Sequence, residues 1–328
     1  MNAETSKNSL MNQTEDQMID EIASLKEQKR IAIYAHYYQP IEIQKIADFI
    51  GDSLGLAKIA REREESDIIV LAGVHFMAET ASILNQAKII LSPNFQAGCP
   101  LASFLNLNII NEYRAQYPGT PLIVYVNTTA ETKAFSDVCC TSSNAVRVVE
   151  KAAQEWNTDT ILFGPDKNLA TFVENRTSLK IIKVPEMGNC PIHNFISMND
   201  IDKAKKKHPG ASLLVHPECP VEVQNQADFI GSTSQMLQYS QNNPNSNGFI
   251  IGTEMGLVEH LRWKFPNQSY YPLNSAAVCK NMKKIDIRNL LAAIRSVGTP
   301  RQSQYEIRVN STQAAQALQP LERMLKYS

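Results

Sequence analysis

The sequence lacks the features that mark membrane, secreted and nucleic-acid-binding proteins. Its apolar runs are far shorter than the about 20 residues that a membrane-spanning helix needs. Its start, MNAETSKNSLMNQTED, lacks the charged-then-apolar order of a signal peptide. The 32 Lys and Arg are balanced by 33 Asp and Glu, so no basic field favours nucleic acid or an anionic membrane. We therefore expect a globular, cytoplasmic protein with no nucleic-acid or membrane partner.

Cysteine is also scarce, with 6 residues in the chain of 328. That number is too small for a disulfide scaffold, so these cysteines are core residues, metal ligands or nucleophiles. A small buried hydrophobe is the ordinary interpretation of a single cysteine. Three of them, however, lie in loop-like sequence: Cys99 in AGCP, Cys190 in GNCPI and Cys279 in AAVCKN. We expect those three to share a ligand, and Cys139, Cys140 and Cys219 to be structural.

Short β-rich runs alternate with helical patterns along the chain, which predicts βαβ units and parallel sheets. In the first block, strands are predicted at 31–35, 67–73 and 88–91. Helices are predicted at 41–50, 53–64 and 77–86. The block has the order βαβαβ and ends near Cys99. No glycine-rich phosphate loop or nucleophile elbow follows a strand.

The same order recurs twice, so the chain contains an internal threefold repeat. YPGTPLIVY at 117–125 matches HPGASLLVH at 208–216. Four sets of landmarks then recur at matching spacing. The first strands are closed by His36, Tyr125 and His216, and two residues later stand Tyr38, Asn127 and Glu218. The hydroxyls Ser53, Ser142 and Thr233 come next, and the last set is the Gly-x-polar steps Gly73 to His75, Gly164 to Asp166 and Gly252 to Glu254. One of Cys99, Cys190 and Cys279 ends each copy.

Parallel sheets place functional groups beyond the carboxyl ends of their strands. If three such domains turn those ends toward a common axis, the three cysteines converge beneath a ring of polar side chains. The predicted divisions are a tail and helix at 1–29, repeat domains at 30–113, 114–206 and 207–285, and a helical extension at 286–328.

Three converging thiolates suit two kinds of metal group. Zinc would form a closed structural site if His193 supplied a fourth ligand. An iron-sulfur cluster usually takes four cysteines, so three would leave one iron open to act as a Lewis acid. A closed structural zinc site would bind no substrate, so the ring of polar side chains above the three cysteines favours the open cluster.

The other landmarks each allow two interpretations. Ser53, Ser142 and Thr233 open helical patterns, where a hydroxyl is either an N-cap or a group that helps the helix N-terminus hold an anion. These two roles are compatible. His36, Tyr38 and Glu218 are either site residues or ordinary loop residues, while His75, Asp166 and Glu254 are interpreted as helix-start residues.

The sequence resembles the quinolinate synthase family over residues 31–284. The motifs that carry the resemblance are AHYYQP, GDSLGLAK, GVHFMAETA, AGCPLA, VYVNTTAETKAFSD, GNCPIH, HPECP, GTEMG and CKNMKK. The resemblance implies an enzyme of NAD biosynthesis that condenses iminoaspartate with dihydroxyacetone phosphate. It also implies three similar Rossmann-like α/β domains around a pseudo-threefold axis, with the active site at their shared centre, and a transient contact with L-aspartate oxidase.

The resemblance also implies roles for individual residues. Cys99, Cys190 and Cys279 match the ligands of one [4Fe-4S] cluster with an open iron. The matching substrate positions are His36, Tyr38, Ser53, Tyr125, Asn127, Ser142, His216, Glu218 and Thr233. For catalysis we expect Tyr38 and Glu218 to move protons, with His36 and His216 in support. A different iron-sulfur hydro-lyase and a zinc-stabilised binding module remain the alternatives.

Overall fold

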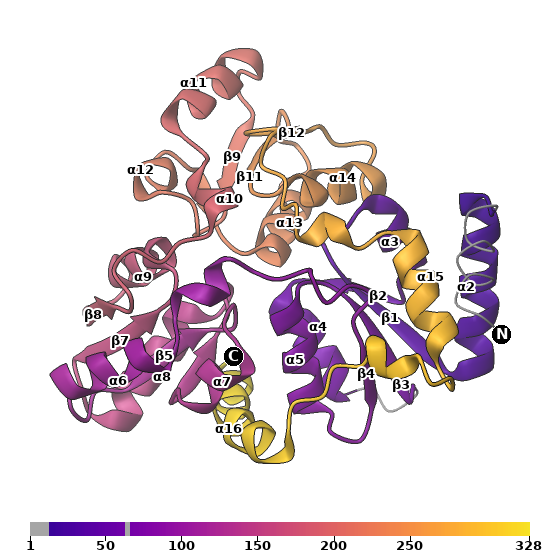
Figure 1. Cartoon of the computed structure of the whole chain (residues 1–328). Coiled ribbons are helices and arrows are strands. Elements are labelled where there is room, and N and C mark those ends of the chain that lie inside the picture. The colour runs from indigo at the N-terminus through magenta and orange to yellow at the C-terminus, as the bar shows by residue number, and fades with distance from the viewer. Residues whose placement is uncertain (1–12, 63–65) are drawn as a thin grey trace.

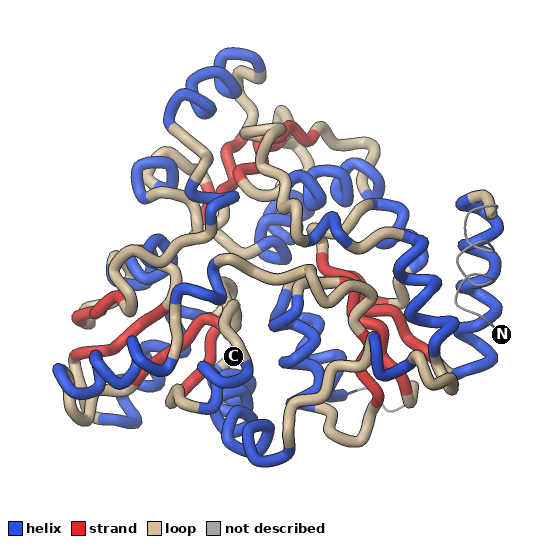
Figure 2. The backbone as a smooth tube through the Cα atoms, in the orientation of Figure 1, coloured by secondary structure: helices blue, strands red, loops and turns tan. Residues whose placement is uncertain are grey.

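The computed structural model describes residues 13–62 and 66–328, which form three four-stranded parallel sheets (Figure 1). Their strand orders, β2-β1-β3-β4, β6-β5-β7-β8 and β10-β9-β11-β12, are equivalent. The predicted α/β fold of three similar Rossmann-like units is therefore confirmed. Figure 1 shows the three units around a common centre, and Figure 2 shows loops rather than helices or strands crossing that centre.

The elements follow the repeats. Repeat one contains β1 (Ile31–His36), α3 (Ile41–Ile46), β2 (Phe49–Gly51), α4 (Ser53–Glu62), β3 (Ile68–Ala72), α5 (His75–Leu84), β4 (Ile89–Leu91) and the 3-10 turn η1 (Leu101–Phe104). Repeat two contains α6 (Leu107–Gln116), β5 (Leu122–Tyr125), α7 (Ala130–Ala134), β6 (Val138–Cys140), α8 (Ala145–Trp156), β7 (Thr160–Gly164), α9 (Lys167–Glu174), β8 (Lys180–Lys183) and α10 (Pro191–Asn194). Repeat three contains α11 (Met198–Lys207), β9 (Ser212–Val215), α12 (Val221–Gln224), β10 (Phe229–Ile230), α13 (Thr233–Asn242), β11 (Phe249–Gly252), α14 (Met255–Lys264), β12 (Tyr270–Pro272) and η2 (Met282–Lys284).

Among the described residues, four further elements lie outside the repeats: α2 (Glu15–Lys29), α15 (Ile287–Ser296), η3 (Gln302–Gln304) and α16 (Ser311–Tyr327). Helices α2 and α15 pack together over repeat one, where an Arg295–Glu21 ion pair of 2.6 Å joins them. Helix α16 lies between repeats one and two and shares their apolar core (Figure 1). None of the helices in the described ranges has the length and apolarity to cross a bilayer.

The predicted helix at 41–50 is wrong in its second half, because residues 49–51 form the extra strand β2. The Asp48 carboxylate accepts the backbone N–H of Ile33 at 2.7 Å and so fixes β2 beside β1. Asp137 and Asp228 do the same for Leu122 and Leu213, each at 2.7 Å. Each repeat therefore has four strands, one more than the predicted βαβαβ order.

The first strand of each repeat is followed by a loop at its carboxyl end, and one buried polar side chain hydrogen-bonds to the backbone carbonyls of that loop. Gln44 donates to the carbonyls of Tyr37 and Gln39 at 2.9 Å, and Gln224 donates to those of Pro217 and Cys219 at 2.8 Å.

Lys133 takes this place in repeat two, and its ammonium donates to the Thr128 carbonyl at 2.5 Å. The same three side chains reach the start of a helix in a neighbouring repeat: Gln44 reaches Gly256, Gln224 reaches Asn168 and Lys133 lies over Phe76. Equivalent contacts thus hold the three units in one arrangement.

The domain boundaries stay a prediction. Helix α6 runs across the boundary that was predicted at residue 113.

Candidate active site

The carboxyl ends of the three sheets open into one cavity of about 580 Å³. All twelve residues that the sequence analysis placed in the site line this cavity: His36, Tyr38, Ser53, Cys99, Tyr125, Asn127, Ser142, Cys190, His216, Glu218, Thr233 and Cys279. They come from all three repeats. The structure therefore brings the candidates together, and their individual roles stay predictions.

The three cysteine loops are held in the same way. In each repeat, the first backbone N–H of the helix after the third strand donates to the carbonyl two residues before the cysteine: His75 to Ala97 at 2.8 Å, Lys167 to Gly188 at 2.7 Å, and Met255 to Ala277 at 3.0 Å. Two of the loops have a second support, because Asp166 accepts the N–H of Cys190 at 2.9 Å and Glu254 that of Cys279 at 3.0 Å.

These contacts correct one alignment of the sequence analysis. Asp166 and Glu254 are N-caps, as the helix-start interpretation expected, but the N-cap in repeat one is Val74 and not His75. His75 is the first helical residue. The cap follows Gly73 directly, whereas one residue lies between the glycine and the cap in repeats two and three. The cap side chain of repeat one, Val74, is therefore apolar, while the caps of the other two repeats are carboxylates.

Gly188 allows the Cys190 loop to approach Pro165 closely. A Cβ at this position would lie 2.0 Å from the Pro165 carbonyl oxygen. We expect Gly188→Ala to destabilise the protein by about 1–3 kcal/mol, since overpacking has that cost. Thermal unfolding checks this. Gly98→Ala is the matched control, because its Cβ would meet nothing within 4 Å; equal unfolding temperatures for both variants would contradict the prediction.

The three cavity cysteines are poor thiolates without a cation. Burial, aided by the charges of Glu218 and Cys279, raises the pKa of Cys99 to about 12. Burial likewise raises the pKa values of Cys190 and Cys279. The Cys279 thiol also raises the pKa of Cys99, and the Cys99 thiol raises that of Cys190, as expected for groups that lie close together. A cation that binds all three would reverse this effect.

Two histidines present N–H donors to the cavity. The backbone N–H of Tyr38 donates to Nδ1 of His36 at 3.1 Å, and that of Glu218 donates to Nδ1 of His216 at 3.3 Å. These bonds assign the ring proton to Nε2 in both residues. Burial lowers the pKa of His36 to about 4 and that of His216 to about 3. Both rings are therefore neutral at pH 7.

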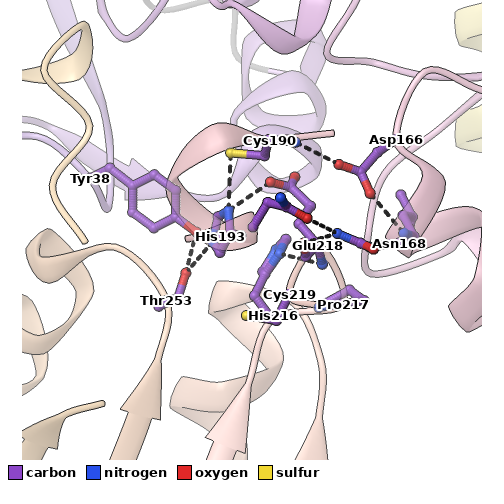
Figure 3. Close-up of polar contacts among 12 residues, drawn as sticks. Tyr38, Asp166, Asn168, Cys190, His193, His216, Pro217, Glu218, Cys219 and Thr253 are labelled. Atoms are coloured by element: carbon purple, nitrogen blue, oxygen red, sulfur yellow. Dashed lines mark hydrogen bonds and ion pairs between the residues drawn. The ribbon is translucent and has the colours of Figure 1, made fainter. Parts of the chain in front are cut away.

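Glu218 lies at the centre of a buried polar cluster (Figure 3). One carboxylate oxygen accepts the Tyr125 hydroxyl at 2.6 Å, and the other lies 2.8 Å from Nδ1 of His193. Burial opposes ionisation of Glu218, but the charge and hydrogen bond of His193, with His216 and Tyr125, hold its pKa well below the usual range. Glu218 is thus an ionised carboxylate with both oxygens occupied.

Tyr38 belongs to the same cluster through Thr253, a residue that the sequence analysis missed. The Thr253 hydroxyl lies 2.6 Å from the Tyr38 hydroxyl and 2.8 Å from Nε2 of His193 (Figure 3). On the other side of Tyr38, the Lys283 ammonium donates to its carbonyl at 2.7 Å and pairs with Glu254 at 3.2 Å. Lys283 was missed too, because its contacts join segments far apart in sequence.

The cavity hydroxyls are not helix caps. Asp52 accepts the Gly55 N–H at 2.9 Å at the start of α4, and Ser232 caps α13. Ser142 lies in the turn before α8. Ser53, Ser142 and Thr233 line the cavity, and the buried Oδ1 of Asn127 has no hydrogen-bond partner among the described residues. These groups are available to a ligand.

The remaining cysteines lie in apolar cores, as expected. Cys139 and Cys140 are fully buried on β6, and the Cys219 thiol donates to the Gly252 carbonyl at 3.4 Å. His193, the fourth zinc ligand of the alternative interpretation, lies beside Cys190 with Nδ1 at 3.2 Å from its sulfur. Cys190, His193 and Glu218 form a group that can hold a metal ion.

Comparison with known proteins gives one family. Residues 20–326 match the family described as quinolinate synthetase A protein. The quinolinate synthase of Thermotoga maritima is 47% identical over 279 residues, which cover 85% of this chain and 91% of that protein. Those of Thermococcus onnurineus and Methanocaldococcus jannaschii are each 43% identical, over 95% and 94% of this chain and 99% and 98% of theirs.

Proposed function

The chain belongs to the quinolinate synthase family of NAD-biosynthetic enzymes, and on that premise we propose that it condenses iminoaspartate with dihydroxyacetone phosphate to quinolinate, phosphate and water. The observation that carries the proposal is the single cavity, because it gathers thiols, hydroxyls and acid-base groups from all three repeats. A contact with L-aspartate oxidase and a cytoplasmic location stay predictions.

Cys99, Cys190 and Cys279 would hold one [4Fe-4S] cluster in each chain. The fit is supported by their equivalent loops and shared cavity, and by the effect of the Cys279 thiol on the pKa of Cys99 and of the Cys99 thiol on that of Cys190. With three protein ligands, such a cluster supplies a Lewis-acidic iron with a free position for a substrate oxygen or nitrogen.

The free hydroxyls and Asn127 would bind the oxygens of the two substrates. Ser53, Ser142 and Thr233 lie on equivalent segments, and these segments are joined by bonds from Ser232 to Asp52 at 3.2 Å and from Gln235 to Ser143 at 3.1 Å. Short hydroxyls near helix starts suit phosphate and carboxylate oxygens.

Proton transfers would fall to Glu218 and Tyr38. Glu218 is ionised and can accept a proton, and Tyr38 can donate one because its hydroxyl stays protonated; burial and the Glu218 charge raise its pKa well above the usual value. Neutral His36 and His216 would donate Nε2–H bonds to oxygens that gain negative charge during the reaction. The His36 and His216 rings could thus stabilise negative charge on a substrate oxygen without carrying a positive charge themselves.

Metal analysis of protein purified without oxygen tests the proposal most directly. We expect a brown protein with about four irons per chain that loses its colour and activity in air. Quinolinate should then form from iminoaspartate and dihydroxyacetone phosphate. Stoichiometric zinc without iron would end the cluster assignment, and a different dehydration product would favour another hydro-lyase.

Lys283 offers a test of how Tyr38 is positioned. Lys283→Met removes the bond to the Tyr38 carbonyl and the ion pair with Glu254, whose carboxylate keeps its bond to the Cys279 N–H. We expect kcat to fall at least about tenfold at matched iron content, since small misplacements of catalytic groups have such effects. The control is Lys284→Met, because Lys284 is exposed. Equal kcat values for the two variants would show that Lys283 does not position Tyr38.

A further inference from the structure

We propose that Cys190, His193 and Glu218 form a second metal site, which takes one Zn²⁺ when the cluster is absent. The site would use one sulfur, one nitrogen and one oxygen ligand from the chain. The inference rests on the proposed function in one respect, because Cys190 is also a proposed cluster ligand. Zinc at this site and a cluster on the three cysteines would therefore exclude each other.

The three donor atoms already lie close together. His193 Nδ1 is 2.8 Å from a Glu218 oxygen and 3.2 Å from the Cys190 sulfur, and all three atoms lie within 4.8 Å of one another. A tetrahedral zinc with ordinary bond lengths separates such atoms by about 3.4–3.6 Å. Each contact of His193 therefore needs to open by only about half an ångström. The cavity that the three residues line supplies the fourth position, for water.

The charge of this ligand set suits a buried zinc ion. One thiolate and one carboxylate cancel the two positive charges, while the imidazole is neutral. His193 is 2% exposed and Glu218 3%, so an uncompensated charge here would carry a large desolvation cost. The alternative set of Cys99, Cys190, Cys279 and His193 would leave one net negative charge. The structure thus favours the mixed ligand set over the one considered from sequence.

Neighbouring groups orient two of the ligands. The Thr253 hydroxyl lies 2.8 Å from His193 Nε2 and can accept its proton when Nδ1 binds the metal. Tyr125 donates to the second Glu218 oxygen at 2.6 Å. Such outer contacts fix the tautomer and direction of metal ligands, and their loss typically weakens binding by about 10–100-fold.

The biochemical consequence is competition between two metals. Zinc binding would take the thiolate of Cys190 from cluster assembly, with release of the thiol proton to solvent, and would occupy the carboxylate proposed as the base. A chain that has lost its cluster would then be held in an inactive, zinc-bound state. Excess zinc during assembly should therefore lower the yield of active enzyme.

Anaerobic titration of iron-free protein with Co²⁺ and Zn²⁺ tests the site. Cobalt reports its ligands, because each thiolate adds a sulfur-to-cobalt charge-transfer absorption. We expect one ion per chain, an absorption typical of one thiolate, and displacement of cobalt by zinc. Cys190→Ser and His193→Gln should weaken zinc binding at least about 100-fold, since each removes a ligand rather than an outer contact. Cys99→Ser and Cys279→Ser should leave it unchanged.

Loss of zinc binding in Cys99→Ser or Cys279→Ser, or an absorption typical of three thiolates, would overturn the proposal in favour of a three-cysteine site. Circular dichroism of each variant confirms that it is folded, and Glu218→Gln replaces His193→Gln if the latter unfolds. Cluster reconstitution is measured separately with iron and sulfide. Zinc that is added before iron and sulfide should slow cluster reconstitution in the parent protein and should not slow it in His193→Gln. Because the titration needs no cluster, failure of the cluster assignment would not be confused with failure of this site.

Discussion

Serine at position 190 is expected to abolish iron binding and quinolinate formation while the chain stays folded. The backbone holds the Cys190 loop through the Lys167–Gly188 bond and the Asp166 carboxylate, and the thiol adds a contact of 3.2 Å with Nδ1 of His193. A serine hydroxyl leaves the backbone bonds intact but is a poor iron ligand. Iron per chain should fall to the background level, with little change in thermal unfolding. We expect the same for serine at 99 and 279.

The core cysteines provide the matched control. Cys139 and Cys140 are fully buried on β6, so Cys139→Ser and Cys140→Ser place a hydroxyl in an apolar core. An unpaired buried hydroxyl costs about 1–3 kcal/mol. These variants should therefore lose thermal stability and keep their iron, which is the opposite pattern. An intact, active cluster in Cys190→Ser would contradict the assignment of the three repeat-equivalent ligands.

The sequence predicted the features that recur locally. Strands β1, β3 and β4 are apolar runs between turn residues, and Gly119 and Gly210 mark equivalent turns with φ of 78° and 79°. The repeat spacing then placed the candidate residues on equivalent loops. Because parallel strands end at one edge of a sheet, this was enough to predict that the candidates meet.

Strand β2 was missed because its signal is short and indirect. Three residues carry too little periodicity to separate them from the preceding helix, and an aspartate bond to β1 fixes their position. The identical ADFIG segments in repeats one and three were the available signal. Asp48 and Asp228 in those segments make the same bond in both repeats.

The spacing of residues along the sequence could not predict the contacts between repeats. Thr253 joins Tyr38 to His193, and Lys283 joins Tyr38 to Glu254, so each bridges segments from different units. Such contacts depend on how the units pack, which no local pattern encodes. The same limit explains why His193 was considered only as a zinc ligand beside three cysteines, and not as the partner of Glu218.

Glutamine at position 218 is expected to slow quinolinate formation at least about 100-fold, the low end for loss of an acid-base group. Gln keeps the size of Glu218 and can still accept the Tyr125 hydroxyl, but it cannot accept a proton at neutral pH. It also removes the negative charge beside His193. The variant should fold, assemble its cluster and still bind a dicarboxylate. Anaerobic turnover at matched iron content measures the effect.

Cys219→Ser is the control for this variant, because position 219 is adjacent and equally buried. Its side chain donates away from the cluster of polar residues, to the Gly252 carbonyl at 3.4 Å, and a serine hydroxyl keeps a donor directed at that carbonyl. Turnover should therefore stay near that of the parent. Near-normal turnover by Glu218→Gln would instead move the base to Tyr38 or a histidine. A histidine could take that role only if its Nδ1 were released from the backbone N–H that it accepts, and Tyr38 only if it lost the proton that burial and the Glu218 charge hold on its hydroxyl.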